Sequence, residues 1–151
     1  MTLSRTISAA LLFLAAACVP ASAEDGWITV TSANSAEVAK DKLVAAIEQS
    51  PASLFAVMDH RKNAQSVGLD LAPIYLVMFG NPKVGTPIMQ ADPRAGHDLP
   101  VRVLVWEQDG KTMLSALAPL AYSSRYDVNG AVDALGKMEN AVRTLMDKAA
   151  E

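Results

Sequence analysis

Short apolar runs and two longer stretches with helical spacing alternate along this chain. Residues 26–32 are rich in β-branched side chains, which is typical of a strand. Further strands are predicted at 53–61, 72–80, 101–108 and 111–119. The last two are joined by Asp109-Gly110, a dipeptide that favours a two-residue hairpin turn.

Two amphipathic helices are predicted, one after the first strand and one at the C-terminal end. Asn34 is the predicted cap of the first helix, with Glu37 completing a capping-box pair, and that helix ends near Gln49. Its apolar stripe is Ala36, Ala39, Leu43, Ala46 and Ile47. Asn129 is the predicted cap of the second helix, whose apolar stripe is Val132, Leu135, Met138, Val142, Leu145 and Ala149.

The order of these elements, β-α-β-β-β-β-α, predicts an α+β fold. It places two helices on one face of a single, mainly antiparallel sheet. The other face would carry Leu104, Trp106 and, depending on the register, Leu114. Three interpretations of that face stay open: a homodimer formed through the sheet, a ligand cleft on it, or ordinary surface apolarity.

The first residues have the order of a secretory signal peptide. Arg5 is followed by an apolar stretch of roughly a dozen residues, which is shorter than a membrane span, and by Ala21-Ser22-Ala23 before acidic residues. We expect cleavage after Ala23, so that 1–23 is removed and 24–151 forms a single secreted or periplasmic domain without a transmembrane segment. Lipidation at Cys18 is the alternative, because a small-residue run ends at that cysteine.

Composition removes several function classes. Cys18 is the chain's one cysteine, so the mature domain offers no thiol for a disulfide, a metal ligand or a nucleophile. The formal net charge is −3 and no basic cluster occurs, which argues against nucleic-acid binding. We expect no cofactor. The predicted partners are a second copy of the chain and a small-molecule ligand or an envelope protein.

The stretch FGNPKVGTPIMQADPRAG (79–96) is the most unusual connection in the chain. Asn81 is a predicted helix cap with Pro82 in the first turn, which places a short helix near 83–90. Its prolines and the absence of a lysine after the second glycine argue against a nucleotide phosphate loop. The segment is either a cap with a crossover connection or a ligand site with Lys83, Thr86, Met89 and Gln90 along its rim.

The longer stretch FGNPKVGTPIMQADPRAGHDLPVRVLVWE resembles the family known as domain of unknown function 302. The resemblance rests on FGNP at 79–82, KVGTPIM at 83–89, LPVRVL at 99–104 and the Asp59-His60 pair, and it covers roughly residues 35–120. Residues 61–64 depart from the family pattern, where small residues are more usual. The resemblance implies a β-α-β(4)-α fold related to the TATA-binding-protein arrangement, often a dimer, and no established reaction.

His60 follows the second predicted strand and is the other candidate site residue. It would meet Asn81, His97 or Asp98 from the 81–98 segment. The leading hypothesis is a non-enzymatic binding domain that uses His60, Asn81, Lys83, Thr86, Met89 and Asp98. One alternative is a copper-handling or zinc site formed by His60 and His97 with Met89 or Asp98. Another is an enzyme with His60 and Asp98 in acid–base roles.

Overall fold

The computed structural model describes residues 26–151, so the predicted signal segment and Cys18 lie outside the described residues. The strands are β1 (Trp27–Ser32), β2 (Ser53–Asp59), β3 (Ile74–Gly80), β4 (Val101–Gln108) and β5 (Lys111–Leu117). The α-helices are α1 (Ala36–Glu48), α2 (His60–Ser66), α3 (Pro82–Ala91) and α4 (Val132–Ala150). Short 3-10 helices occupy Pro93–His97, Pro119–Ser124 and Asn129–Ala131.

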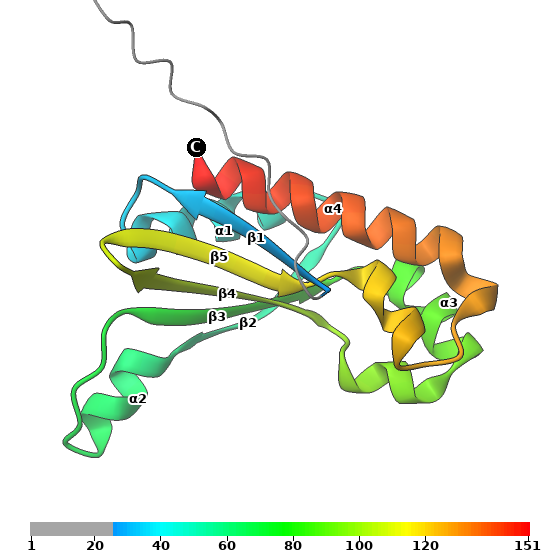
Figure 1. The fold of residues 1–151 in the computed structure, drawn as a ribbon, viewed down its shortest axis with the longest axis horizontal. Coiled ribbons are helices and arrows are strands. Elements are labelled where there is room, and N and C mark those ends of the chain that lie inside the picture. Colours follow the sequence, from blue (N-terminus) through cyan, green and yellow to red (C-terminus); the bar gives the residue numbers. More distant parts are fainter. Residues whose placement is uncertain (1–25) are drawn as a thin grey trace, which may run out of the picture.

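The strands form one five-stranded sheet in the order β1-β5-β4-β3-β2, and every neighbouring pair is antiparallel. The long helices α1 and α4 lie on the same side of this sheet (Figure 1). The predicted α+β class and its two-helix layer are therefore confirmed. Among the described residues, no helix combines the length and the apolar character that crossing a membrane requires.

The core lies between the sheet and the α1–α4 layer. On β4, Val103 and Val105 are fully buried and alternate with more exposed neighbours, as a strand covered on one side requires. Leu43 of α1 and Leu135 of α4 belong to the same buried cluster and are 0% and 1% exposed. Helix α4 begins with Asp133 in its first turn and carries Lys148 in its last, a charge arrangement that suits the helix dipole.

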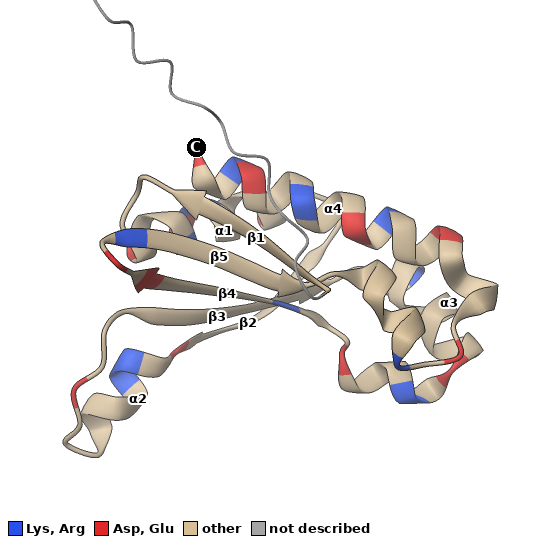
Figure 2. Cartoon of the chain, viewed as in Figure 1, with Lys and Arg blue, Asp and Glu red and all other residues tan. Residues whose placement is uncertain are grey.

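The opposite face of the sheet has no helix layer, and apolar side chains run across it. One cross-strand row is Thr29, Ser115, Leu104, Leu76 and Met58, and the next is Thr31, Met113, Trp106 and Ile74. The strands are largely free of charge except near their ends (Figure 2). Leu104 and Trp106 are on this face as predicted. Leu114 is not, because it pairs with Val105 and is fully buried under the helices. We call the two rows the open sheet face.

The caps predicted for the two long helices are both displaced along the chain. Helix α1 is capped by Ser35, whose hydroxyl accepts a hydrogen bond from the backbone N–H of Val38, and Asn34 instead bonds to the Ser32 hydroxyl. Asn129 lies in a 3-10 turn before α4 rather than at its cap. Neighbouring polar residues compete for one cap position, and the chain's path into the helix decides between them.

The strand predicted to reach residue 61 ends at Asp59. Asp59 caps α2 by accepting a hydrogen bond from the backbone N–H of Lys62 (2.9 Å), so His60 begins a helix rather than ending a strand. The capping bond outweighs the alternation pattern here because Asp is a strong N-cap residue. Helix α2 has no buried residue, and it projects away from the sheet at the β2–β3 turn (Figure 1).

Candidate ligand-binding cleft

A large apolar cleft lies at the end of the sheet where β3 and β4 meet α3 and α4. Its volume is about 660 Å³. Phe79 at the end of β3 and Val101 at the start of β4 line it, and both side chains also belong to the buried core. The cleft is therefore an opening into one end of the hydrophobic core.

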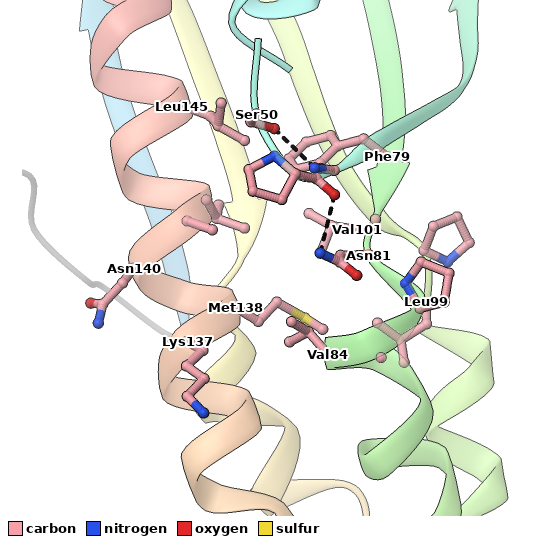
Figure 3. A pocket seen from close by; sticks show the side chains of 18 of the residues that line it. Ser50, Phe79, Asn81, Val84, Leu99, Val101, Lys137, Met138, Asn140 and Leu145 are labelled. Carbon is pink, nitrogen blue, oxygen red and sulfur yellow. Dashed lines mark hydrogen bonds between the residues drawn. The ribbon is translucent and has the colours of Figure 1, made fainter. Parts of the chain in front are cut away.

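Helix α4 supplies one wall of the cleft and the segment 80–101 supplies much of the other. Met138, Val142 and Leu145 line it from α4, spaced so that they share one face of that helix. Val84 of α3 and Leu99 line it from the opposite wall, and Figure 3 shows the two walls facing each other. All five side chains are apolar, so the two walls offer a ligand an apolar surface on both sides.

Asn81 lies between the two walls and fixes the local backbone. Its side-chain oxygen accepts a hydrogen bond from the N–H of Lys83 (2.9 Å), which caps α3 as the sequence predicts. Its side-chain NH₂ donates to the carbonyl oxygen of Pro51 (3.1 Å), as Figure 3 shows. Pro82 occupies the first turn, where its missing N–H needs no partner. The cap therefore also ties α3 to the loop that follows α1.

Polar groups are confined to the margins of the cleft. Asn140 and Thr144 are exposed residues on α4 that line it, and Ser50 lines it from the loop after α1. The Ser50 hydroxyl is already engaged, because it accepts a hydrogen bond from the N–H of Ala52 and donates to the carbonyl of Ile47. Lys137 and Lys148 also line the cleft from α4.

The structure brings three of the predicted site residues to this cleft. Asn81, Thr86 and Met89 line it. Lys83 does not, but it lines a smaller adjoining hollow together with Lys137. The short helix predicted near 83–90 is α3, at Pro82–Ala91.

His60 lies at the other end of the sheet from Asn81. In the β2–β3 pair, Asp59 stands opposite Tyr75 and Ser53 opposite Gly80, so the strand length separates the two ends by about 20 Å at a rise of about 3.3 Å per residue. The structure therefore does not bring His60 together with His97 or Asp98, and this corrects the metal and acid–base arrangements considered above. Within residues 26–151, no three His, Cys, Asp or Glu side chains are close enough to hold a metal ion.

Asp98 is the centre of a buried polar cluster. Its carboxylate accepts hydrogen bonds from Arg102 (2.8 Å), Arg125 (3.2 Å) and Tyr126 (2.7 Å). The Tyr122 hydroxyl donates to its backbone carbonyl (2.9 Å), and burial raises the pKa of Tyr122 to about 12. The hydrogen bond to Asp98 raises the pKa of Tyr126. These contacts join the segment before β4 to the segment after β5, which is a structural role.

The comparisons with known proteins agree with this architecture. The family model described as Domain of unknown function DUF302 matches residues 28–145. The chain belongs to the DUF302 family. A crystal structure of an uncharacterized conserved DUF302 protein from Bacillus stearothermophilus has the same fold, with a TM-score of 0.73 over 83% of this chain and 99% of that one. Its sequence identity is 16%, so this likeness concerns the fold.

Curated relatives of this DUF302 chain are longer proteins. Two are the fluoride-specific ion channels FluC 1 of Brucella suis biovar 1 and of Brucella abortus biovar 1, each 34% identical over 106 residues. The match takes in 70% of this chain but only 42% and 39% of those relatives. The chain thus spans less than half the length of the curated relatives it matches, and their name describes the whole of each longer protein.

The FGNP and KVGTPIM segments of the DUF302 motif form one side of the cleft. Gly80 lies against both neighbours, because a Cβ at this position would be in ordinary van der Waals contact with the Phe55 ring (3.4 Å) and Pro100 (3.6 Å). Phe55 sits at an irregularity in the β2–β3 register and also lines the cleft. The motif therefore both ends β3 and shapes the opening beside it.

Sequence reasoning missed the α4 wall of the cleft. Met138, Val142 and Leu145 fall on the predicted apolar stripe, and the prediction treated the whole stripe as core. Their side chains are buried, but they border an opening as well. Exposed Ala141 lies beside them, and a small residue next to an apolar stripe is the one signal that the sequence holds.

Proposed function

We propose that this chain is a small non-enzymatic binding domain that holds an apolar ligand in the cleft between α3 and α4. The observation that carries the proposal is the size and lining of the cleft. Its volume of about 660 Å³ falls within the range of small-molecule sites, which is about 300–1,000 Å³. Apolar walls with a few polar groups at the margin are the usual composition of such sites.

The chemistry of the lining supports binding over catalysis. The polar side chains that line the cleft belong to serine, threonine, asparagine and lysine. Among the described residues, no histidine, aspartate or glutamate lines it. Histidine, aspartate and glutamate are the side chains that most often act as general acids or bases within hydrogen-bond reach of a substrate.

The N-terminal sequence supports a secreted or periplasmic location for this binding domain. Cleavage after Ala23 would release the domain, and lipidation of Cys18 would anchor it. Mass spectrometry of the protein recovered from its own cell envelope separates the two processing routes. The same spectrum reveals a retained ligand.

The open sheet face supports a homodimer as the working form of the domain. Its two cross-strand rows carry apolar and uncharged polar side chains only, so two copies of the face meet without charge repulsion. Met58, on the edge strand β2, is 40% exposed. Burial of such a surface favours association by about 25 cal/mol per Å² of apolar area before the costs of association.

A substitution that fills the cleft tests the proposed function. Ala141 is exposed on α4 and lines the cleft, so Ala141→Trp places an indole in the opening without replacing a core residue. Val132→Trp is the matched control, because Val132 is 52% exposed on the same helix and does not line the cleft. The probe is Nile red, an uncharged apolar dye.

We expect the native domain and the Val132→Trp variant to enhance Nile red fluorescence to the same extent. The Ala141→Trp variant should lose most of the enhancement while its circular dichroism and melting temperature stay close to the native values. Equal enhancement in all three proteins would place the dye elsewhere and would count against the cleft as the binding site.

A further inference from the structure

Two lysines converge at one end of the cleft. Lys83, in the first turn of α3, and Lys137, in α4, line a hollow of about 210 Å³ beside the cleft. Val84 and Lys137 line both cavities, so the hollow adjoins the cleft at this end. Figure 3 shows Lys137 at the end of the cleft away from Leu145 and Ser50.

The charge at this end is positive. Asp133 also lines the hollow, so its side chains carry two positive charges and one negative charge. Within the described residues, neither lysine is in an ion pair with Asp133 or with another carboxylate. A carboxylate or phosphate at this position would therefore meet two ammonium groups that have no competing partner at salt-bridge distance.

The opposite end of the cleft differs in its chemistry. Besides Lys137, the lysine that lines the cleft among the described residues is Lys148. The two are about 16 Å apart along α4 at about 1.5 Å per residue. A single head group cannot contact both. Near Ser50 the hydroxyl and the Pro51 carbonyl already have hydrogen-bond partners. The Lys83–Lys137 end is therefore the better anion site.

We propose that the ligand is a single-chain amphiphile with an anionic head group. The head group lies between Lys83 and Lys137, and the apolar chain runs along the cleft past Met138, Val142 and Leu145. This inference rests on the proposed function, because it specifies the ligand of the same cleft. Exposed Ala141 and Thr144 at the margin leave the cleft open along its length, which suits lateral entry of a chain.

Three ligands of equal chain length test the proposal: dodecanoate, dodecyl phosphate and dodecanol. Their dissociation constants are measured by titration calorimetry on the full mature domain, below the concentrations at which the ligands aggregate. The variants are Lys83→Ala/Lys137→Ala, with Lys148→Ala as the matched control on the same helix and cleft. Carboxylate and phosphate share the required charge, and the two arms distinguish which head group is preferred.

We expect at least one of the two anions to bind 10-fold or more tightly than dodecanol. The Lys83→Ala/Lys137→Ala variant should lose that difference and bind the anion and the alcohol alike, whereas Lys148→Ala should keep it. Equal binding of all three by the native domain would overturn the inference. A loss of the anion preference in Lys148→Ala alone would also overturn it.

The outcomes separate this inference from the proposed function. If dodecanol binds and Ala141→Trp prevents its binding, the cleft is a ligand site whatever the head-group preference. If neither the anions nor the alcohol bind while Ala141→Trp still removes Nile red binding, the inference fails and the proposed function stands. If Nile red also fails to bind in the cleft, both proposals fail. Raising the salt concentration gives an independent readout, because an exposed charge contact weakens with screening and burial of the chain does not.

Discussion

The side-chain NH₂ of Asn81 donates a hydrogen bond to the carbonyl oxygen of Pro51 over 3.1 Å. The same side chain caps α3 through the N–H of Lys83. One residue thus joins the loop after α1 to the start of α3, and both segments border the cleft. The asparagine in the FGNP motif serves the shape of the cleft as well as the stability of the helix.

Two substitutions at Asn81 separate these roles. Asn81→Asp keeps an oxygen that caps α3 but loses the NH₂ that donates to Pro51. Asn81→Ala loses both interactions and should lower the free energy of unfolding by about 1–2 kcal/mol. Chemical denaturation should show a smaller loss for Asn81→Asp. We expect both variants to lose Nile red binding, because the link to Pro51 shapes the wall. Normal Nile red binding by Asn81→Asp would show that the cleft depends on the cap of α3 and not on the hydrogen bond to Pro51.

Asp98 should contribute to stability rather than to ligand binding. Asp98→Ala leaves Arg102, Arg125 and Tyr126 without their shared acceptor, and hydrogen bonds to a charged group are worth about 1.5–3 kcal/mol each. Arg102 and Arg125 are 44% and 50% exposed and regain water when Asp98 is removed, so the three contributions do not simply add. We expect urea denaturation to show a loss of about 2–3 kcal/mol. Asp133→Ala, at an exposed carboxylate that has no ion pair within residues 26–151 but lies in the first turn of α4, should lower stability by no more than about 0.3–1 kcal/mol. A native-like stability of Asp98→Ala would refute the structural role.

Asp92 should give the domain a dependence on acidic pH. Hydrogen bonds from Arg94 hold the pKa of this carboxyl well below its ordinary value of 3.8, and the N–H of Asp127 adds another. A lowered folded-state pKa contributes stability above the unfolded pKa, and that stability is lost as the pH falls toward the folded value. Asp92→Asn should therefore be less stable than the native domain at pH 7.

The measurement is the free energy of unfolding of both proteins between pH 7 and pH 2.5. The difference between native and Asp92→Asn proteins should stay constant at neutral pH and shrink once the pH falls below about 4. A difference that grows on acidification would have the wrong sign for a lowered pKa.

The open sheet face predicts the oligomeric state. Leu104 is half-buried at the middle of this face, so Leu104→Glu puts a charge where a second copy would cover it. We expect the native domain to sediment as a dimer and Leu104→Glu as a folded monomer. Val132→Glu, on the exposed side of α4, should stay dimeric. A native domain that is monomeric at tens of micromolar would remove the dimer proposal.

The strands, the two long helices and the layer arrangement could be predicted because their signals are local. Val101, Val103 and Val105 alternate within one strand, and Leu135, Met138 and Val142 recur at helical spacing. Periodicity of this kind depends on the side-chain geometry of the element itself. The cap at Asn81 was predictable for the same reason, since it needs only the residues that follow it.

Helix α2 and the role of His60 show where local signals compete. Asp59 fits the end of a strand and also caps a helix, and in the folded chain the capping bond to Lys62 decides the outcome. The register of β5 decided which face of the sheet Leu114 occupies. Because Leu114 pairs with Val105, its side chain lies on the helix-covered face. A one-residue change in register moves a side chain to the other face, and the sequence of one strand does not specify its partner's position.

By itself, the sequence determined the α+β class, the five strand segments, the two long helices and the capped helix that begins after Asn81. Only the tertiary structure decided that Met138 and Val142 of α4 face Val84 across an opening, and that His60 lies far from it. The physical reason is that periodicity reports which side of an element is apolar. Whether that side meets a close-packed neighbour or a gap depends on how distant segments are placed, and no local pattern encodes that placement.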